Sequence, residues 1–504
     1  MAQSNPITIQ GWPKGVGASP YVGFGKMVGM DIFRKPGVIQ AGVSLNQWDL
    51  GHSSGYITSR PTVEVTDSSG NLFTGFSDGT IKYGSFTIAT TGKVIHDMVI
   101  VNDYLVISKS DTELSLYGPI SGAASFTLSW KTGMELSTNG WKKMFVGQDN
   151  VIYIGNETKL ASITGIASSI GSWTLNTSCL STGIPQSRVI QTICEINRYV
   201  AIMTTVGNGT YGSAVLYYMD RGLKDTLGTS FFLTIGVPIP ERFINQMVNQ
   251  NNRLLFFGCD TGTIYTSNTV TYSPIAVIPG RLQAQNYTTY ANAVAIINNE
   301  VLFGIGGSFN TAFDTVYGVY SIRGNSLITK NTISSGEYGQ TTSVAIGFIS
   351  AFPNGTYHVG WQTGLSTFGI DLADYRIGAN YTCWFESPLY ETGEALKPRT
   401  FQTAQFNFGN NLVSGQALKI YYRQSSNAPW VYYATYSYSG TTLTMTFWDG
   451  TTSSQVLPSN QSGFNSFASK FPVTLTTNVQ VKVPFDTGNA PYGSNIELQS
   501  IILI

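Results

Sequence analysis

The sequence predicts an all-β protein with three parts: an irregular N-terminal arm over residues 1–46, a β-propeller of about seven blades over 47–373, and a β-sandwich over 374–504. Three observations predict this fold class. The chain contains 28 Tyr, 27 Phe and 9 Trp beside 54 Gly, a composition that favours strands separated by tight turns and argues against disorder. A strand-and-turn pattern repeats through the middle of the chain. No stretch of about 12 residues keeps a helical periodicity.

The first part, residues 1–46, carries too little regular pattern to build a core of its own. Glycines recur through it, and we expect its contact residues to be Trp12, Tyr21, Phe24, Arg34 and Lys35. A segment of this kind can become ordered by lying on a neighbouring subunit. We therefore expect an assembly arm, and expect that deleting residues 2–36 leaves a folded monomer that cannot assemble.

The second part contains seven copies of one pattern, in which a polar turn leads into a strongly apolar strand. Each copy opens with an asparagine: Asn71, Asn102, Asn150, Asn197, Asn251, Asn299 and Asn354. After the first interval the copies start about 50 residues apart, near the roughly 40 to 50 residues of a four-stranded propeller blade. Asparagine suits the turn because it tolerates left-handed backbone. Seven blades are predicted, with six or eight as alternatives.

The third part, residues 374–504, shows strands without a repeat, which predicts a β-sandwich of jelly-roll or lectin-like type. One strand is rich in aromatic residues: Trp430, Tyr432, Tyr433, Tyr436 and Tyr438. Tyrosine is enriched at protein interfaces, and aromatic rings also stack on sugars. This strand is therefore predicted to form a core or interface face, with a glycan-binding face as the alternative.

Charged residues make up 11% of the chain, against about 25% in an ordinary soluble domain, and 28 basic residues balance 28 acidic ones. No overall basic field attracts nucleic acid or an anionic membrane. The N-terminus lacks a basic stretch followed by an apolar core, and no run of about 18 apolar residues occurs. We expect no membrane span and synthesis in a cytoplasm.

The residues that could carry chemistry form no specific pattern. The cysteines, Cys179, Cys194, Cys259 and Cys383, are scattered and have no ligand spacing for zinc. His96 beside Asp97 could orient a general base, and Glu386 with Glu391 could form a glycosidase pair. Each of these pairs is more simply explained as structural. We expect no enzyme, no catalytic residue, no metal and no cofactor.

Two segments add a family resemblance. GMDIFRKPGVIQAGVSLN leads into the propeller, and WFESPLYETGEALKPRTFQTAQF leads into the sandwich. The order of arm, propeller and sandwich, with these segments at the two junctions, resembles the tail nozzle proteins (tail tubular protein B-like proteins) of short-tailed bacteriophages. The D-x-x-R-K-P-G motif, from Asp31 to Gly37, looks like the start of this family.

The resemblance implies a structural virion protein that forms a ring, usually six-fold, at the distal end of a phage tail. DNA would leave through this ring without sequence-specific binding. The partners it implies are further copies of the chain in a hexamer, a tail adaptor ring and tail fibres. The alternatives are a carbohydrate-binding protein or glycosidase with a propeller and a lectin domain, and a receptor-binding component of the tail tip.

Overall fold

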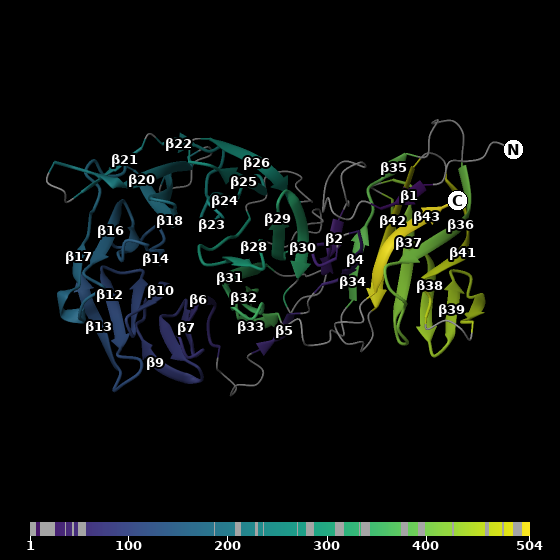
Figure 1. Cartoon of the computed structure of the whole chain (residues 1–504), viewed down its shortest axis with the longest axis horizontal. Helices are drawn as coiled ribbons and strands as arrows, with labels where there is room; N and C mark the ends of the chain where they lie inside the picture. Colours follow the sequence, from purple (N-terminus) through teal and green to yellow (C-terminus); the bar gives the residue numbers. More distant parts are fainter. Residues whose placement is uncertain are drawn as a thin grey trace.

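The structure is a computed structural model, and the residues that it describes divide into two units joined side by side (Figure 1). These residues are 7–10, 26–35, 37–42, 45–48, 57–185, 187–206, 213–226, 230–234, 236–269, 271–278, 287–307, 317–331, 333, 343–373, 382–391, 399–425, 428–458, 463–475, 478–486 and 496–504. Strands dominate them, with a 3-10 turn, η3 (Ile170–Ser172), between two strands. No helix in this part of the chain has the length and hydrophobicity of a membrane span.

The larger unit contains seven consecutive antiparallel sheets, which we number 1 to 7 in chain order. Sheet 1 consists of β6 (Pro61–Thr66), β7 (Leu72–Phe76), β8 (Thr80–Tyr83) and β9 (Phe86–Thr90). Sheet 2 consists of β10 (Ile95–Val101), β11 (Tyr104–Lys109), β12 (Glu113–Gly118) and β13 (Ser125–Thr132). Sheet 3 consists of β14 (Met144–Val146), β15 (Ile152–Asn156), β16 (Lys159–Thr164) and β17 (Thr174–Asn176).

Sheets 4 to 7 continue the same meander. Sheet 4 consists of β18 (Arg188–Ile196), β19 (Tyr199–Val206), β20 (Val215–Lys224) and β21 (Phe231–Leu233), with β22 (Val237–Pro238) also paired to β20. Sheet 5 consists of β23 (Met247–Gln250), β24 (Arg253–Gly258), β25 (Thr263–Ser267) and β26 (Tyr272–Val277). Sheet 6 consists of β27 (Val294–Ile297), β28 (Glu300–Ile305), β29 (Gly318–Arg323) and β30 (Ser326–Asn331). Sheet 7 consists of β31 (Val344–Ala351), β32 (Tyr357–Thr363), β33 (Thr367–Ala373) and, from the N-terminal side, β5 (Leu45–Gln47).

The seven sheets close into a ring in the manner of a β-propeller. The first strand of each sheet contacts the first strand of the next, and β31 of sheet 7 contacts β6 of sheet 1. β5 adds the outermost strand to sheet 7, with Leu45 opposite Ala373 and Gln47 opposite Asp371. A segment from before sheet 1 therefore completes the last sheet and ties the two ends of the ring together.

The role predicted for the repeated asparagines is confirmed in five of the seven copies. Their backbones are left-handed: Asn102 (φ 45°), Asn150 (φ 55°), Asn197 (φ 52°), Asn251 (φ 52°) and Asn299 (φ 65°). In the other two copies a neighbouring glycine takes this conformation, Gly70 beside Asn71 and Gly355 beside Asn354. These turns therefore require a residue that tolerates positive φ, and either asparagine or glycine meets this requirement.

The smaller unit consists of two sheets that share one core. The eight-stranded sheet contains β34 (Thr382–Glu386), β35 (Tyr390–Glu391), β37 (Ala417–Arg423), β38 (Val431–Ser439), β39 (Thr442–Phe447), β40 (Thr452–Val456), β42 (Asn478–Asp486) and the N-terminal β2 (Lys26–Val28). The six-stranded sheet contains β36 (Arg399–Phe408), β41 (Ser466–Leu475), β43 (Glu497–Leu503) and the N-terminal β1 (Ile7–Ile9), β3 (Met30–Asp31) and β4 (Ile39–Ala41). Rings from the two sheets meet in the core, where Phe406 lies 5.1 Å from Tyr436.

The prediction of an irregular N-terminal arm is wrong for the residues that the structure describes. β1 pairs with β43 at the other end of the chain, β2 pairs with β34, and β3 and β4 add to the six-stranded sheet. Ile9, Met27 and Met30 are buried in the shared core. These strands are two or three residues long, so they show no periodicity, and their partners are distant in sequence.

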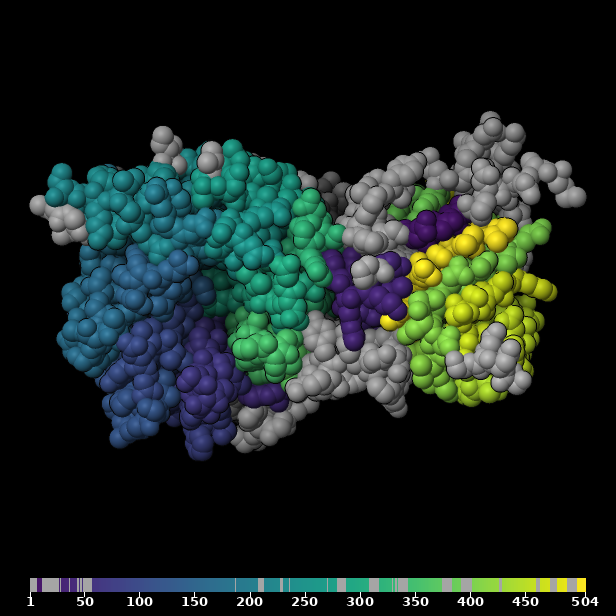
Figure 2. Space-filling view, in the orientation of Figure 1, coloured from purple at the N-terminus to yellow at the C-terminus, as the bar shows by residue number. Residues whose placement is uncertain are grey.

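The N-terminal strands also form the joint between the two units. β2 and β3 contact β30 of sheet 6, and Ile328 of β30 belongs to the same buried cluster as Met30. The Arg323 guanidinium donates a hydrogen bond to the carbonyl oxygen of Phe33 (3.2 Å). In the space-filling view the N-terminal residues, in purple, lie between the propeller and the C-terminal strands (Figure 2).

Candidate functional site

A hydrogen-bonded network of polar side chains joins four sheets at the centre of the propeller. Asn292, just before β27 of sheet 6, donates to the carbonyl oxygens of Thr62 in sheet 1 (2.9 Å) and His96 in sheet 2 (2.7 Å). Its amide oxygen accepts a hydrogen bond from Lys143, just before sheet 3, at 2.5 Å. The Lys143 ammonium also lies 3.2 Å from the buried carboxylate of Asp97. One side chain thus bridges sheet 6 to sheets 1 and 2 across the inner strands of the ring.

His96 and Asp97 do not form the catalytic pair that their adjacency in sequence allowed. His96 is buried, its ring stacks on Trp141 at 4.2 Å, and its Nδ1 accepts the backbone N–H of Lys142 (3.1 Å). Asp97 pairs with Lys143 instead, and burial raises the pKa of its carboxyl. Burial, with a smaller effect of the Lys142 charge, lowers the pKa of His96 to about 3. The imidazole is a neutral structural group.

This low pKa makes the stability of the propeller depend on pH. His96 has a pKa of about 6.5 when unfolded, so the unfolded chain binds a proton between pH 6.5 and 3 that the folded chain does not. His96 therefore costs about 1.4 kcal/mol of stability for each pH unit below 6.5. We expect His96→Asn to lose less stability than the wild type between pH 7 and pH 4.5, measured by urea unfolding at each pH. An equal loss in both proteins would contradict a buried neutral imidazole.

The candidate ligand site lies in the C-terminal unit, between the edge strands of its two sheets. We call it the edge cleft; it has a volume of about 630 Å³, within the range of small-molecule sites. β40 ends the eight-stranded sheet and β41 ends the six-stranded sheet. The residues that line the edge cleft are Tyr433, Met445, Phe447, Trp448, Asp449, Thr451, Thr452, Ser453, Gln455, Ala468, Ser469 and Lys470.

Trp448 gives the edge cleft a fixed aromatic surface. Its side chain is 53% exposed, although its ring stacks on Tyr433 at 5.4 Å and 28°. Its backbone N–H donates to the carbonyl oxygen of Tyr433 (2.9 Å). Tyr433 is itself buried and packs on Phe471 at 4.6 Å. The indole is therefore packed on Tyr433 and otherwise open to solvent.

Asp449 places a charged acceptor beside this ring. One oxygen of its carboxylate, Oδ1, accepts the backbone N–H (2.9 Å) and hydroxyl (2.6 Å) of Thr451. These bonds lower the pKa of Asp449, so the carboxylate is ionised at neutral pH. Oδ2 makes no hydrogen bond to the residues that the structure describes. Gly450 (φ 81°) completes the turn, and Lys470 adds an exposed cation on the opposite wall.

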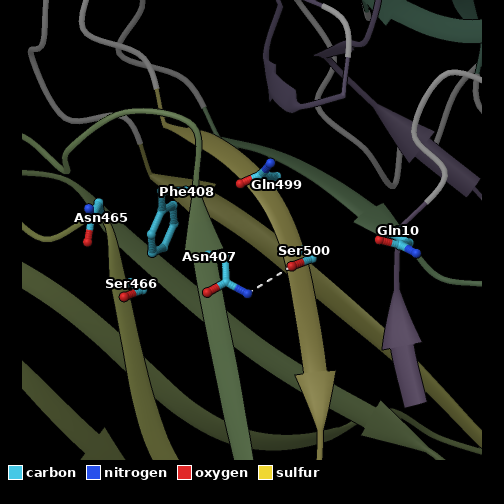
Figure 3. Close-up of a pocket in the computed structure, with 7 residues that line it drawn as sticks. All are labelled: Gln10, Asn407, Phe408, Asn465, Ser466, Gln499 and Ser500. Atoms are coloured by element: carbon cyan, nitrogen blue, oxygen red, sulfur yellow. Dashed lines mark hydrogen bonds between the residues drawn. The ribbon is translucent and has the colours of Figure 1, made fainter. Parts of the chain in front are cut away.

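A second concavity, of about 430 Å³, lies beside β36, β41 and β43 (Figure 3). Its lining is Gln10, Asn407, Phe408, Asn465, Ser466, Gln499 and Ser500, with no charged side chain. Asn407 donates to the hydroxyl of Ser500 across the two strands (2.9 Å). Phe408 is buried, so this groove offers amides and hydroxyls but no exposed ring. It is a weaker candidate than the edge cleft.

The predicted arm residues are only partly described. Trp12, Tyr21 and Phe24 lie outside the described residues. Arg34 and Lys35 are exposed, and the Lys35 ammonium forms an ion pair with Glu497 of β43 in the same chain. Lys35 therefore already has an intramolecular partner at the joint.

The structure places three of the five residues of the tyrosine-rich strand in the core. Tyr433, Tyr436 and Tyr438 are buried in the shared core, which was one of the faces predicted for this strand, and Tyr433 also lines the edge cleft. Trp430 and Tyr432 are partly exposed. The Arg423 guanidinium lies 4.2 Å from the Trp430 ring, and the Tyr432 ring lies 5.5 Å from Tyr421.

The other residues considered for chemistry are Glu386, Glu391 and the four cysteines. Glu386 is buried on β34, where Arg423 and Lys482 each lie 3.8 Å from its carboxylate, and only the backbone of Glu391 is described. The four cysteines are unpaired, and burial raises the pKa of each thiol. Among the described residues no three His, Cys, Asp or Glu side chains are grouped as a metal site would need.

The sequence reasoning missed Trp448, Asp449 and Lys470. The signal was present in FWDG, residues 447–450, because an Asp-Gly turn after an aromatic pair exposes a ring at the end of a hairpin strand. Asp449 and Lys470 are also two of only seven charged residues between 401 and 504, counted from the sequence. The sequence does not show which of these residues share a cleft, because that depends on how strands far apart in the chain are arranged.

No family model and no curated protein matches this sequence. Among solved structures, an extracellular domain assigned to a hybrid two-component system of B. thetaiotaomicron is 12% identical with a TM-score of 0.44. That match covers 81% of this chain and 53% of the other, so this chain spans about half the length of that protein. The β-propeller domain of Swd1 from Myceliophteria thermophila is 13% identical with a TM-score of 0.41, over 63% of this chain and 96% of that domain. BamB from Moraxella catarrhalis is 11% identical with a TM-score of 0.38, over 66% of this chain and 96% of that one. Each of these likenesses concerns the fold alone.

Proposed function

We propose that this chain is a structural protein of a bacteriophage tail that works as a ring of identical copies, as the tail nozzle proteins it resembles do. On this proposal the seven sheets are the blades of one seven-bladed propeller and the C-terminal unit is a β-sandwich. The protein is not an enzyme. Its partners are further copies in a hexamer, a tail adaptor ring and tail fibres, and its place is the tail of the virion.

The observation that carries the proposal is the position of residues 29–40, GMDIFRKPGVIQ. This segment contains Asp31, Arg34 and Lys35 of the motif on which the resemblance rests, and it supplies β3 and β4. Asp31 is buried and accepts the backbone N–H groups of Phe33 (2.7 Å) and Arg34 (3.2 Å). The motif therefore fixes the bend at the joint between the two units. On this proposal the joint holds the two units of each ring subunit together while DNA passes.

The hydrogen bonds of Asn292 and Lys143 support one detail of this function. They bridge sheets 1, 2, 3 and 6 across the inside of the ring, so on this proposal DNA passes through the opening between copies of the chain and not through the propeller of one copy. A surface with few charges suits this passage, because each phosphate contact would add salt-dependent affinity and retain the DNA.

The oligomeric state of the purified full-length protein tests the proposal. Light scattering is expected to give a mass that rises with protein concentration toward a fixed multiple of the chain mass, six on this proposal. A mass that stays at one chain at every concentration would count against the ring.

A further inference from the structure

We infer that the edge cleft is a binding site for a neutral glycan, with one sugar ring stacked on Trp448. This inference goes beyond the proposed tail function and does not depend on it. It combines three observations: an exposed and immobilised indole, polar walls on both sides of it, and a cleft of about 630 Å³ between two sheet edges.

The indole offers the surface that a sugar ring needs. The face of an aromatic ring is electronegative and attracts the partly positive C–H groups on one face of a pyranose. The Trp448 ring is already packed against Tyr433, and the backbone bond between the two residues fixes the main chain from which the side chain extends. Little side-chain freedom is therefore lost on binding, and less of the interaction energy is spent on ordering.

The walls offer the groups that sugar hydroxyls need. A hydroxyl both donates and accepts, and the cleft presents carboxylate, amide, ammonium and hydroxyl groups from Asp449, Gln455, Lys470 and Ser453. Oδ2 of Asp449 is open to a donor because Thr451 occupies only Oδ1. One carboxylate and one ammonium balance each other across the cleft. This balance favours a neutral ligand over a polyanion.

A strand from a second copy is the competing occupant. All five residues of β40 are exposed, and an edge strand with unpaired backbone groups can accept another strand. Such pairing uses the backbone of β40 and leaves the walls of the cleft without a role. The grouping of Trp448 with polar side chains therefore favours the glycan.

The test uses the full-length protein on a printed array of neutral oligosaccharides, followed by calorimetry with the oligosaccharide that binds best. Trp448→Ala is expected to raise its Kd at least tenfold, as expected for an aromatic anchor, and Asp449→Asn about fivefold. Phe86→Ala, on the propeller, removes another exposed aromatic ring (73% exposed) and is expected to leave Kd unchanged. Circular dichroism of each variant confirms that it is folded.

Two results would overturn the inference. One is that no array oligosaccharide is retained by the wild type; the other is that folded Trp448→Ala and Asp449→Asn both bind with the wild-type Kd. Self-association that Val456→Lys on β40 abolishes, without any glycan binding, would assign the cleft region to a second copy instead. Light scattering on the Trp448→Ala protein separates this test from the tail proposal, because ring formation is expected to survive the loss of the indole.

Discussion

Replacing Gly347 with alanine is expected to destabilise the propeller by about 3 kcal/mol or more, because it separates sheet 7 from sheet 1. Gly347 is buried at a bulge in β31, and an added Cβ would lie 1.8 Å from the carbonyl oxygen of Pro61 in β6. The obstacle is backbone in the first strand of a neighbouring sheet, so no side-chain rotation relieves the clash. Sheets 7 and 1 must therefore move apart, and the urea concentration at the midpoint of unfolding should fall.

The matched control for this substitution is Gly171→Ala. Gly171 lies in η3, where an added Cβ would meet nothing within 4 Å, and its expected effect is within about 0.5 kcal/mol. If Gly347→Ala unfolded at the same urea concentration as Gly171→Ala and the wild type, sheets 7 and 1 would not meet as the structure places them.

Deleting residues 2–36 is expected to unfold the C-terminal unit, which reverses the outcome expected from the sequence. The deletion removes Ile9, Met27, Met30 and Ile32, each buried in the shared core. At roughly 2 kcal/mol for each buried side chain, the loss is on the order of 8 kcal/mol, comparable with the whole stability of a domain. The propeller keeps β5, so limited proteolysis should digest residues 382–504 first and leave the propeller.

Lys35→Ala is the control within the deleted segment. Its side chain is 47% exposed and pairs with Glu497, and a surface ion pair contributes about 0 to 1 kcal/mol. We expect this variant to resist protease as the wild type does. A deletion protein with wild-type protease resistance would show that the N-terminal strands are dispensable for the fold.

The parts of the fold that the sequence predicted are those set by local chemistry. The propeller repeat was visible because each copy carries its own turn, and Asn102, Asn150 and Asn197 adopt the positive φ for which asparagine was chosen. A second local signal is the position of glycine within the second strand of several sheets. Gly75, Gly155 and Gly304 lie next to the last residue of the second strands of their sheets, at points where a Cβ would strike a side chain of the next sheet.

The parts that the sequence could not predict depend on contacts between distant residues. β1 pairs with β43 at the opposite end of the chain, and nothing within the three residues Ile7–Ile9 specifies that partner. The same holds for the edge cleft, where Trp448 and Lys470 come from different sheets. For the tyrosine-rich strand the alternation left a core, an interface and a glycan face open, and only the packing of the two sheets shows that Tyr433, Tyr436 and Tyr438 lie in the core.

Negative-stain imaging of the full-length protein over increasing concentration tests the central claim most directly. The proposed function predicts closed rings with a central opening between copies, and with each propeller placed around that opening. Particles with a single propeller and a single C-terminal unit at every concentration would contradict the claim that this chain works as a ring.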